Sequence, residues 1–130
     1  MTVRAVRGAI QLDQDERGEM LDSVKTLFKE MLDANGLGQD DLISVIFTAT
    51  QDLHSVFPAV AARELGLTDV PLMCAQELSI EGALPRVVRI LVHAECERPK
   101  CEIRHVYLGG AAALRTDLAG AGLAGAGGVR

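Results

Sequence analysis

The most regular pattern along the chain is a stripe of apolar side chains between residues 15 and 34. Apolar residues recur there at spacings of three and four, at Met20, Leu21, Val24, Leu27, Phe28, Met31 and Leu32. This period predicts an amphipathic helix over 15–34 whose stripe packs into the core. Asn35 and Gly36 tolerate the left-handed conformation that commonly ends a helix, so we expect the helix to stop there.

Three segments have the composition of strands. Residues 3–10 are short, partly β-branched and mixed in polarity, which is typical of a strand. Residues 42–48 are almost continuously apolar, which predicts a strand near the centre of a sheet with both faces buried. A short apolar run after Pro71, ending at residues 74–77 (CAQE), predicts a third and shorter strand.

Two longer strands are expected at 87–92 and 103–108. The segment 96–101 between them is too short for a crossover connection, so we expect a hairpin loop with the two strands antiparallel. The alternation of a strand would place Tyr107 on the same face as Ile103 and His105.

A second helix is predicted within the segment 53–66. Pro58 suits its first turn, Gly66 suits its C-terminal cap, and Ala59 and Arg63 lie four apart on one helical face. The order is then strand, helix, strand, helix, short strand and two long strands. This order predicts an α+β domain in which helices pack on one face of a mixed β-sheet.

Arg89 interrupts the apolar segment 87–92. Strand alternation puts it on one face with Val87 and Leu91, and both faces of this strand look buried. A guanidinium group is rarely buried without an anion, which can belong to the protein or to a ligand. Glu77 is the nearest candidate partner in sequence.

Composition narrows the class of protein. The 130 residues suit one domain, and hydrophobic residues make up 48% with only one Tyr, three Phe and no Trp, so aliphatic packing dominates. The net charge of −5 and the lack of a basic run argue against nucleic acid and anionic membrane surfaces as partners. No apolar run approaches the ~20 residues of a membrane span, and no signal-peptide pattern begins the chain. We therefore expect a cytoplasmic protein.

The usual signatures of metal, cofactor and nucleophilic chemistry are missing from the sequence. Three cysteines and three histidines have no ligand spacing, and there is no phosphate-binding glycine loop or nucleophile elbow. What remains are arginines beside apolar segments, with Glu77, Cys74 and Tyr107; the arginines are Arg7, Arg63, Arg89 and Arg115. From pattern alone, two interpretations stay open: ordinary ion pairs, or a site for a small polyanion.

Four stretches of the sequence resemble one known family. Residues 48–59 (TATQDLHSVFPA), followed by 61–65 (AAREL), resemble a signature of the monofunctional α/β chorismate mutases. So do residues 4–9 (RAVRGA), 70–77 (VPLMCAQE) and 103–108 (IRHVYL), all in the family's order. The resemblance covers about residues 1–118, which we expect to form the chorismate mutase domain. The Gly- and Ala-rich residues 119–130 are expected to be a flexible tail.

The resemblance implies the [3,3] rearrangement of chorismate to prephenate, in the synthesis of phenylalanine and tyrosine, without a cofactor. A pericyclic step needs a compact substrate conformer and stabilisation of developing charge, not a nucleophile. By resemblance, Arg89 faces the ether oxygen, while Glu77 and Cys74 engage the substrate hydroxyl and the opposite end of the polarised system. Arg7 with Tyr107 is expected to hold a carboxylate.

The remaining binding residues implied by the resemblance are Phe57, Ala59, Arg63, Met73, Leu114 and Arg115. Phe57 and Ala59 match the pocket wall, and Arg63 and Arg115 match peripheral arginines. Met73 departs from the pattern, because many relatives carry a threonine there.

The resemblance also implies a homotrimer, described as a pseudo-barrel, with an active site between each pair of subunits. One alternative is a non-catalytic trimer that captures a small dicarboxylate or imine metabolite, and another is a trimer whose arginines only join subunits. The pair of Glu77 and Arg89 favours the enzyme, since an anion binder gains nothing from a carboxylate beside its cation.

Overall fold

A five-stranded mixed sheet forms the framework of the computed structural model, which describes residues 1–114. Arg115 and the tail predicted at 119–130 lie outside the described residues. The strands lie in the order β3-β2-β4-β1-β5 and span β1 Val3–Gln11, β2 Leu42–Ala49, β3 Leu72–Gln76, β4 Val87–Glu95 and β5 Val106–Leu108. The pairs β1–β4 and β2–β4 are antiparallel, whereas β2–β3 and β1–β5 are parallel. The α+β class and the mixed sheet are therefore confirmed.

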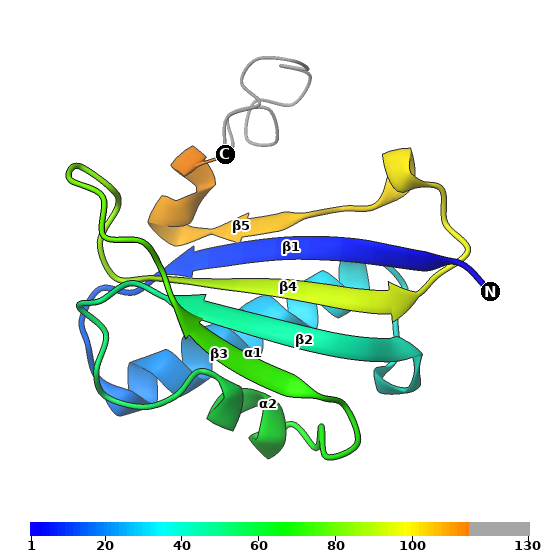
Figure 1. The fold of residues 1–130 in the computed structure, drawn as a ribbon, viewed down its shortest axis with the longest axis horizontal. Helices are drawn as coiled ribbons and strands as arrows, with labels where there is room; N and C mark the ends of the chain where they lie inside the picture. The colour runs from blue at the N-terminus through cyan, green and yellow to red at the C-terminus, as the bar shows by residue number, and fades with distance from the viewer. Residues whose placement is uncertain (115–130) are drawn as a thin grey trace.

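Both helices pack on the same face of this sheet (Figure 1). The long helix α1 spans Arg17–Ala34, and all seven residues of its predicted apolar stripe are buried. It begins where the Glu16 carboxylate accepts hydrogen bonds from the backbone N–H groups of Gly18 and Glu19. A Cβ atom at Gly8 of β1 would collide with the sulfur of Met31, so glycine at this position lets α1 approach the sheet closely.

The end of α1 is fixed by a buried asparagine. Asn35 is the C-cap with φ −114°, and Gly36 alone takes the left-handed conformation, with φ 65°. The Asn35 side chain donates to the carbonyl oxygens of Met31 and Arg104, and its Oδ1 accepts the Arg104 N–H at 2.7 Å. The helix end is thereby tied to the segment that leads into β5.

The second helix occupies the later part of the predicted segment 53–66 and begins next to Pro58, as predicted. Helix α2 spans only Ala59–Glu64, with Pro58 at its N-cap, and residues 53–58 form a loop. The backbone N–H groups of His54 and Ser55 in this loop donate to a carboxylate from outside the loop. Gly66 does end the helix, with φ 98°, as predicted.

The prediction of a hairpin at 96–101 was wrong. Strand β5 is shorter than the predicted 103–108, and it lies beside β1, so β1 separates it from β4. The connection passes the N-terminal end of β1, where the Cys96 N–H donates to the Thr2 carbonyl oxygen. The antiparallel direction relative to β4 is correct, but β4 already has β1 and β2 as neighbours and no free edge remains.

Within the single chain, β2 and β4 are covered on one face only, whereas the sequence predicted burial on both faces. On the face that meets the helices, Val45 and Phe47 of β2 and Val88 and Ile90 of β4 are at most 1% exposed. The opposite face of the sheet, which we call the open face, has no helix over it, and its side chains at 46, 48, 89 and 91 are only half-buried. The centre of the sheet is β4, with β2 next to it.

Candidate active site

A row of polar side chains crosses the open face of the sheet. Arg89 of β4 is directly opposite Thr48 of β2 and Ala9 of β1, and Ala9 is opposite Tyr107 of β5. Because directly opposed residues point to the same side of a sheet, Thr48, Arg89 and Tyr107 share the open face. Strand pairing thus aligns polar residues of three strands, and two of them, Thr48 and Tyr107, are 59 positions apart in the sequence.

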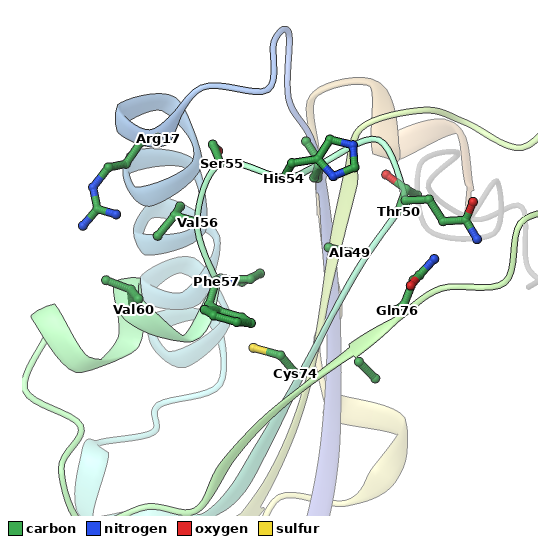
Figure 2. Close-up of a pocket in the computed structure, with 14 residues that line it drawn as sticks. Arg17, Ala49, Thr50, His54, Ser55, Val56, Phe57, Val60, Cys74 and Gln76 are labelled. Atoms are coloured by element: carbon green, nitrogen blue, oxygen red, sulfur yellow. The ribbon is translucent and has the colours of Figure 1, made fainter.

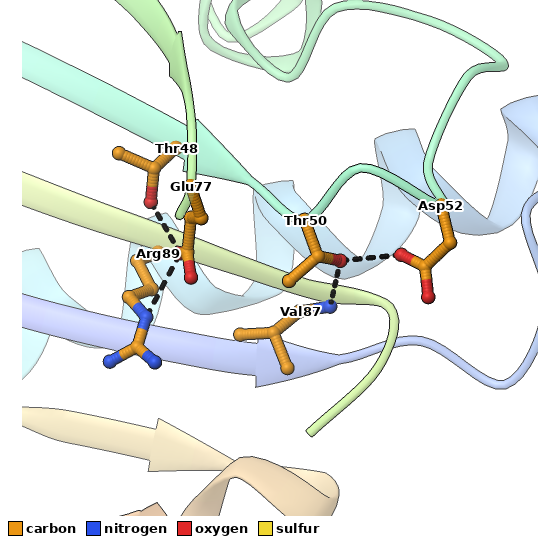
Figure 3. A network of polar contacts seen from close by, with 6 residues as sticks. All are labelled: Thr48, Thr50, Asp52, Glu77, Val87 and Arg89. Carbon is orange, nitrogen blue, oxygen red and sulfur yellow. Dashed lines mark hydrogen bonds and ion pairs between the residues drawn. The ribbon is translucent and has the colours of Figure 1, made fainter. Parts of the chain in front are cut away.

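Glu77 joins this row from the end of β3. Its backbone N–H donates to the carbonyl oxygen of Ala49 at 3.0 Å, which extends the strand pairing by one residue. Its Oε2 atom accepts a hydrogen bond from Thr48 Oγ1 at 2.6 Å and one from Arg89 Nε at 2.9 Å (Figure 3). The predicted ion pair between Arg89 and Glu77 is therefore confirmed, and the two side chains are 29% and 15% exposed.

Some hydrogen-bonding atoms of this ion pair are available to a ligand. Both hydrogen bonds reach the same carboxylate oxygen, and Arg89 contributes only its Nε atom. Within residues 1–114, Glu77 Oε1 and the two terminal nitrogens of Arg89 make no hydrogen bond, and these nitrogens point away from Glu77 (Figure 3). A hydrogen-bond acceptor and a forked cationic donor therefore lie next to each other on the open face.

Arg7 and Tyr107 lie on the same face. Arg7 precedes Ala9 by two residues in β1, so alternation places its side chain on the open face, and its backbone N–H donates to His105 Nδ1 at 3.0 Å. Tyr107 packs with Leu84 and Leu114 around a small cluster of Ala9, Val87 and Ala111. The structure thus brings four predicted residues together, with Leu114 beside them; the four are Arg7, Glu77, Arg89 and Tyr107.

A groove of about 900 Å³ lies at the edge of the sheet, on the side of the helices (Figure 2). The loop 53–58 and the end of β3 form its walls, and Arg17 of α1 contributes to its lining. Phe57 stands in it 70% exposed. Cys74 also lines the groove, and it is opposite the fully buried Phe47, so its side chain points to the helix side of the sheet.

The other predicted site residues are dispersed. Met73 is 59% exposed, and alternation in β3 places it on the open face with Glu77 rather than with Cys74. Ala59 is buried in the first turn of α2 and Arg63 is exposed in its last turn, and neither lines the groove. Arg115 lies outside the described residues.

Sequence reasoning missed the residues that hold this site in place. Thr48 appeared only inside the family signature, and its bond to Glu77 depends on strand pairing that no local pattern reveals. Thr50 Oγ1 donates to Asp52 at 2.6 Å and accepts the Val87 N–H at 3.0 Å (Figure 3). Asp52 also accepts the N–H of Arg86, so this network fixes the start of β4 at Val87, two residues before Arg89.

Two features are absent from the part of the chain that the structure describes. No group of three or more His, Cys, Asp or Glu residues is arranged to hold a metal ion. No helix is both long enough and apolar enough to cross a membrane.

The fold and the site define a chorismate mutase of the α/β type, and a solved relative has the same architecture. A structure of chorismate mutase from Clostridium thermocellum superposes with a TM-score of 0.84 at 42% identity, covering 85% of this chain and 99% of that one. Residues 3–118 match the family model described as chorismate mutase type I; the chain belongs to this family, and it is an isomerase that acts on chorismate.

Two curated relatives agree with this assignment. The chain is 44% identical over 117 residues to chorismate mutase AroH of Thermus thermophilus, covering 89% of this chain and 96% of the relative. It is 38% identical over 119 residues to chorismate mutase AroH of Bacillus subtilis strain 168, covering 91% and 94%. The resemblance stated from the sequence is therefore confirmed, and the family decides against a non-catalytic binder and a purely structural trimer.

Proposed function

We propose that this chorismate mutase works as a homotrimer and converts chorismate to prephenate in sites shared between neighbouring subunits. The observation that carries the proposal is the separation of the predicted residues: Arg89 and Glu77 lie on the open face, whereas Cys74 and Phe57 lie on the helix side. The open face of one subunit would meet the groove of its neighbour. A substrate between them would touch both sets at once.

The open face would supply the electrostatic part of catalysis. When the ether bond of chorismate stretches ahead of carbon–carbon bond formation, negative charge grows on the ether oxygen. The terminal nitrogens of Arg89 would donate hydrogen bonds to this oxygen, and they gain strength in a site from which the partner subunit excludes water. Glu77 would hold Arg89 through Nε and accept a hydrogen bond from the substrate hydroxyl through Oε1.

The groove would supply the shape of the site. Cys74 of the neighbouring subunit would help to confine the substrate in its compact reactive conformer, which removes part of the entropic barrier. Phe57 of the same subunit would form an outer wall against which the substrate binds. Arg7 and Tyr107 would hold one carboxylate. Arg63 would attract the dianion at the rim, where an exposed arginine assists binding more than the chemical step.

Apolar exposure supports an assembly that covers the open face. Met73 is 59% exposed there, and the loop that follows Glu77 presents Leu78 and Ile80 at 84% and 63% exposed. Apolar groups gathered around a polar site mark a surface that is suited to a second copy of the chain. We also propose residues 1–118 as the catalytic domain and the cytoplasm as its compartment, which the three free thiols support.

Mixing two inactive variants tests a shared site. Arg89→Gln disables the open face, and Phe57→Asp places a negative charge in the groove without disturbing the core, because Phe57 is 70% exposed. After dissociation and reassembly of a 1:1 mixture, every mixed trimer contains one intact pair of faces, and about a quarter of all sites should be active. Activity is followed by loss of the diene absorbance of chorismate in the presence of a chelator, with prephenate identified as product.

The control is each variant reassembled alone, which should stay inactive. A mixture no more active than these controls would place the whole site within one chain. The proposal would also be refuted if the fully active protein sedimented as a monomer.

A further inference from the structure

The loop 53–58, which carries Phe57, is held by a carboxylate from a distant part of the chain. Asp15 precedes α1 and accepts two hydrogen bonds, from the His54 N–H to Oδ2 at 3.0 Å and from the Ser55 N–H to Oδ1 at 3.1 Å. These contacts join residues 39 and 40 positions apart. Each carboxylate oxygen thus accepts one backbone N–H group, and the two N–H groups belong to consecutive residues.

The other backbone contacts of the loop are local. The Leu53 N–H donates to the Thr50 carbonyl oxygen, and the Val60 N–H donates to that of Phe57. Such bonds shape the turn but do not fix its place relative to α1. Two half-buried apolar residues of the loop, Leu53 and Val56, pack against the core, and contacts of this kind have no direction. The directional tie between loop and helix is therefore Asp15.

Asp15 itself stands on a rigid support. The Glu19 carboxylate on α1 accepts the N–H groups of Asp13 and Gln14 at 2.6 and 3.2 Å, which folds the segment before the helix back onto its first turn. Desolvation raises the pKa of Asp15, but the interactions with His54 and Ser55 outweigh it, so the pKa lies below its ordinary value. The group is ionised at neutral pH, and its hydrogen bonds are charge-assisted.

We infer that Asp15 is a positioning residue for substrate binding: through His54 and Ser55 it sets the place of Phe57 in the groove. Glu19 of α1 holds the backbone of Asp13 and Gln14, and the next residue, Asp15, holds the loop. The inference rests on the proposed role of Phe57 as a wall of the site. Asp15 touches no reacting atom, so it should affect KM much more than kcat.

The test compares steady-state kinetics of Asp15→Ala, Asp15→Asn and Asp13→Asn. Asp15→Ala should raise KM by roughly fivefold or more and leave kcat within about twofold. Asp15→Asn keeps one acceptor oxygen and should lie between Asp15→Ala and the unmodified enzyme. Asp13→Asn is the matched control, because Asp13 is exposed in the same segment and only its backbone N–H is used, so its KM should not change.

A general loss of folded protein would lower the apparent kcat and leave KM unchanged, so the ratio of the two effects separates positioning from stability. The double variant with Phe57→Ala should raise KM by less than the product of the two single effects, because both act on one wall. Unchanged KM in Asp15→Ala, together with a raised KM in Phe57→Ala, would overturn the inference alone. An unchanged KM in Phe57→Ala would refute the proposed role of Phe57, and the inference with it.

Discussion

Cys74 and Glu77 are three positions apart in the chain, yet their side chains point to opposite faces of the sheet. Cys74 is opposite Phe47, which is buried under the helices, whereas Glu77 reaches Arg89 and Thr48 on the open face. Strand alternation requires this, because positions separated by an odd number fall on different sides. In the proposed homotrimer, these two residues would therefore reach one substrate from two different subunits.

Replacement of Arg89 with glutamine is expected to reduce kcat by at least ~100-fold, or about 3 kcal/mol, the scale of lost oxyanion donors. The reason is that its terminal nitrogens would donate to the ether oxygen only as charge develops there. Steady-state kinetics of the folded variant measure the effect. A near-normal kcat would contradict the role assigned to Arg89.

Arg63→Gln provides the matched comparison, since it removes the same charge from an exposed position on α2. We expect KM to rise while kcat stays close to normal, because a contact at the rim acts on substrate and transition state alike. A loss of kcat as large as that of Arg89→Gln would move Arg63 into the reacting site.

Thr48 is expected to orient Glu77. Thr48→Val has nearly the same shape but cannot donate the 2.6 Å hydrogen bond to Oε2, and kcat/KM should fall by about tenfold, the scale of a hydrogen bond to a charged group. Thr48→Ser keeps the hydroxyl and should retain most of the activity. Equal kcat/KM values for the Val and Ser variants would show that the bond does not matter to catalysis.

Arg86 combines backbone strain with useful contacts. It is the only non-glycine residue of the described chain with a positive φ, 52°, while its Nε donates to the Leu12 carbonyl oxygen at 3.0 Å. Arg86→Ala and Arg86→Gly both lose this bond, but only glycine relieves the strain. The glycine variant should therefore be the more stable by ~1 kcal/mol. Urea unfolding measures the difference, and a more stable alanine variant would argue against strain at this position.

Acid should remove part of the stability that ion pairing supplies. The hydrogen bond from Lys25 holds the pKa of Glu64 below its ordinary value of 4.5, across a contact of 2.7 Å. A depressed carboxyl pKa stabilises the fold above the unfolded-state value, and this contribution is lost as pH falls through the folded-state value. Lys25→Met should flatten the decline of urea stability on the acid side, by a small amount because the pair is exposed.

The control for the acid experiment is Lys29→Met, an exposed lysine of α1 without an ion pair in the described residues. Its stability should depend on pH as that of the unmodified protein does. If Lys25→Met shows the same acid dependence as this control, the Lys25–Glu64 pair contributes nothing measurable.

The sequence by itself determined the elements whose signals are local. The apolar stripe of α1 was predictable because its seven residues repeat with the period of an α-helix, and this repeat places them on one face. The ion pair of Arg89 was predictable because a charge in an apolar strand requires a partner, and Glu77 follows the neighbouring apolar run. The activity was recognisable because short stretches resemble a known family.

Only the tertiary structure decided which strands are neighbours and which faces are covered. No local pattern states that β1 separates β4 from β5, or that Thr48, Arg89 and Tyr107 form one row, because strand pairing depends on contacts between distant parts of the chain. No local pattern states that the loop 53–58 is bound by Asp15, because the two hydrogen bonds join residues 39 and 40 positions apart. Long-range hydrogen bonds of this kind depend on the folded chain, and they hold the wall of the groove.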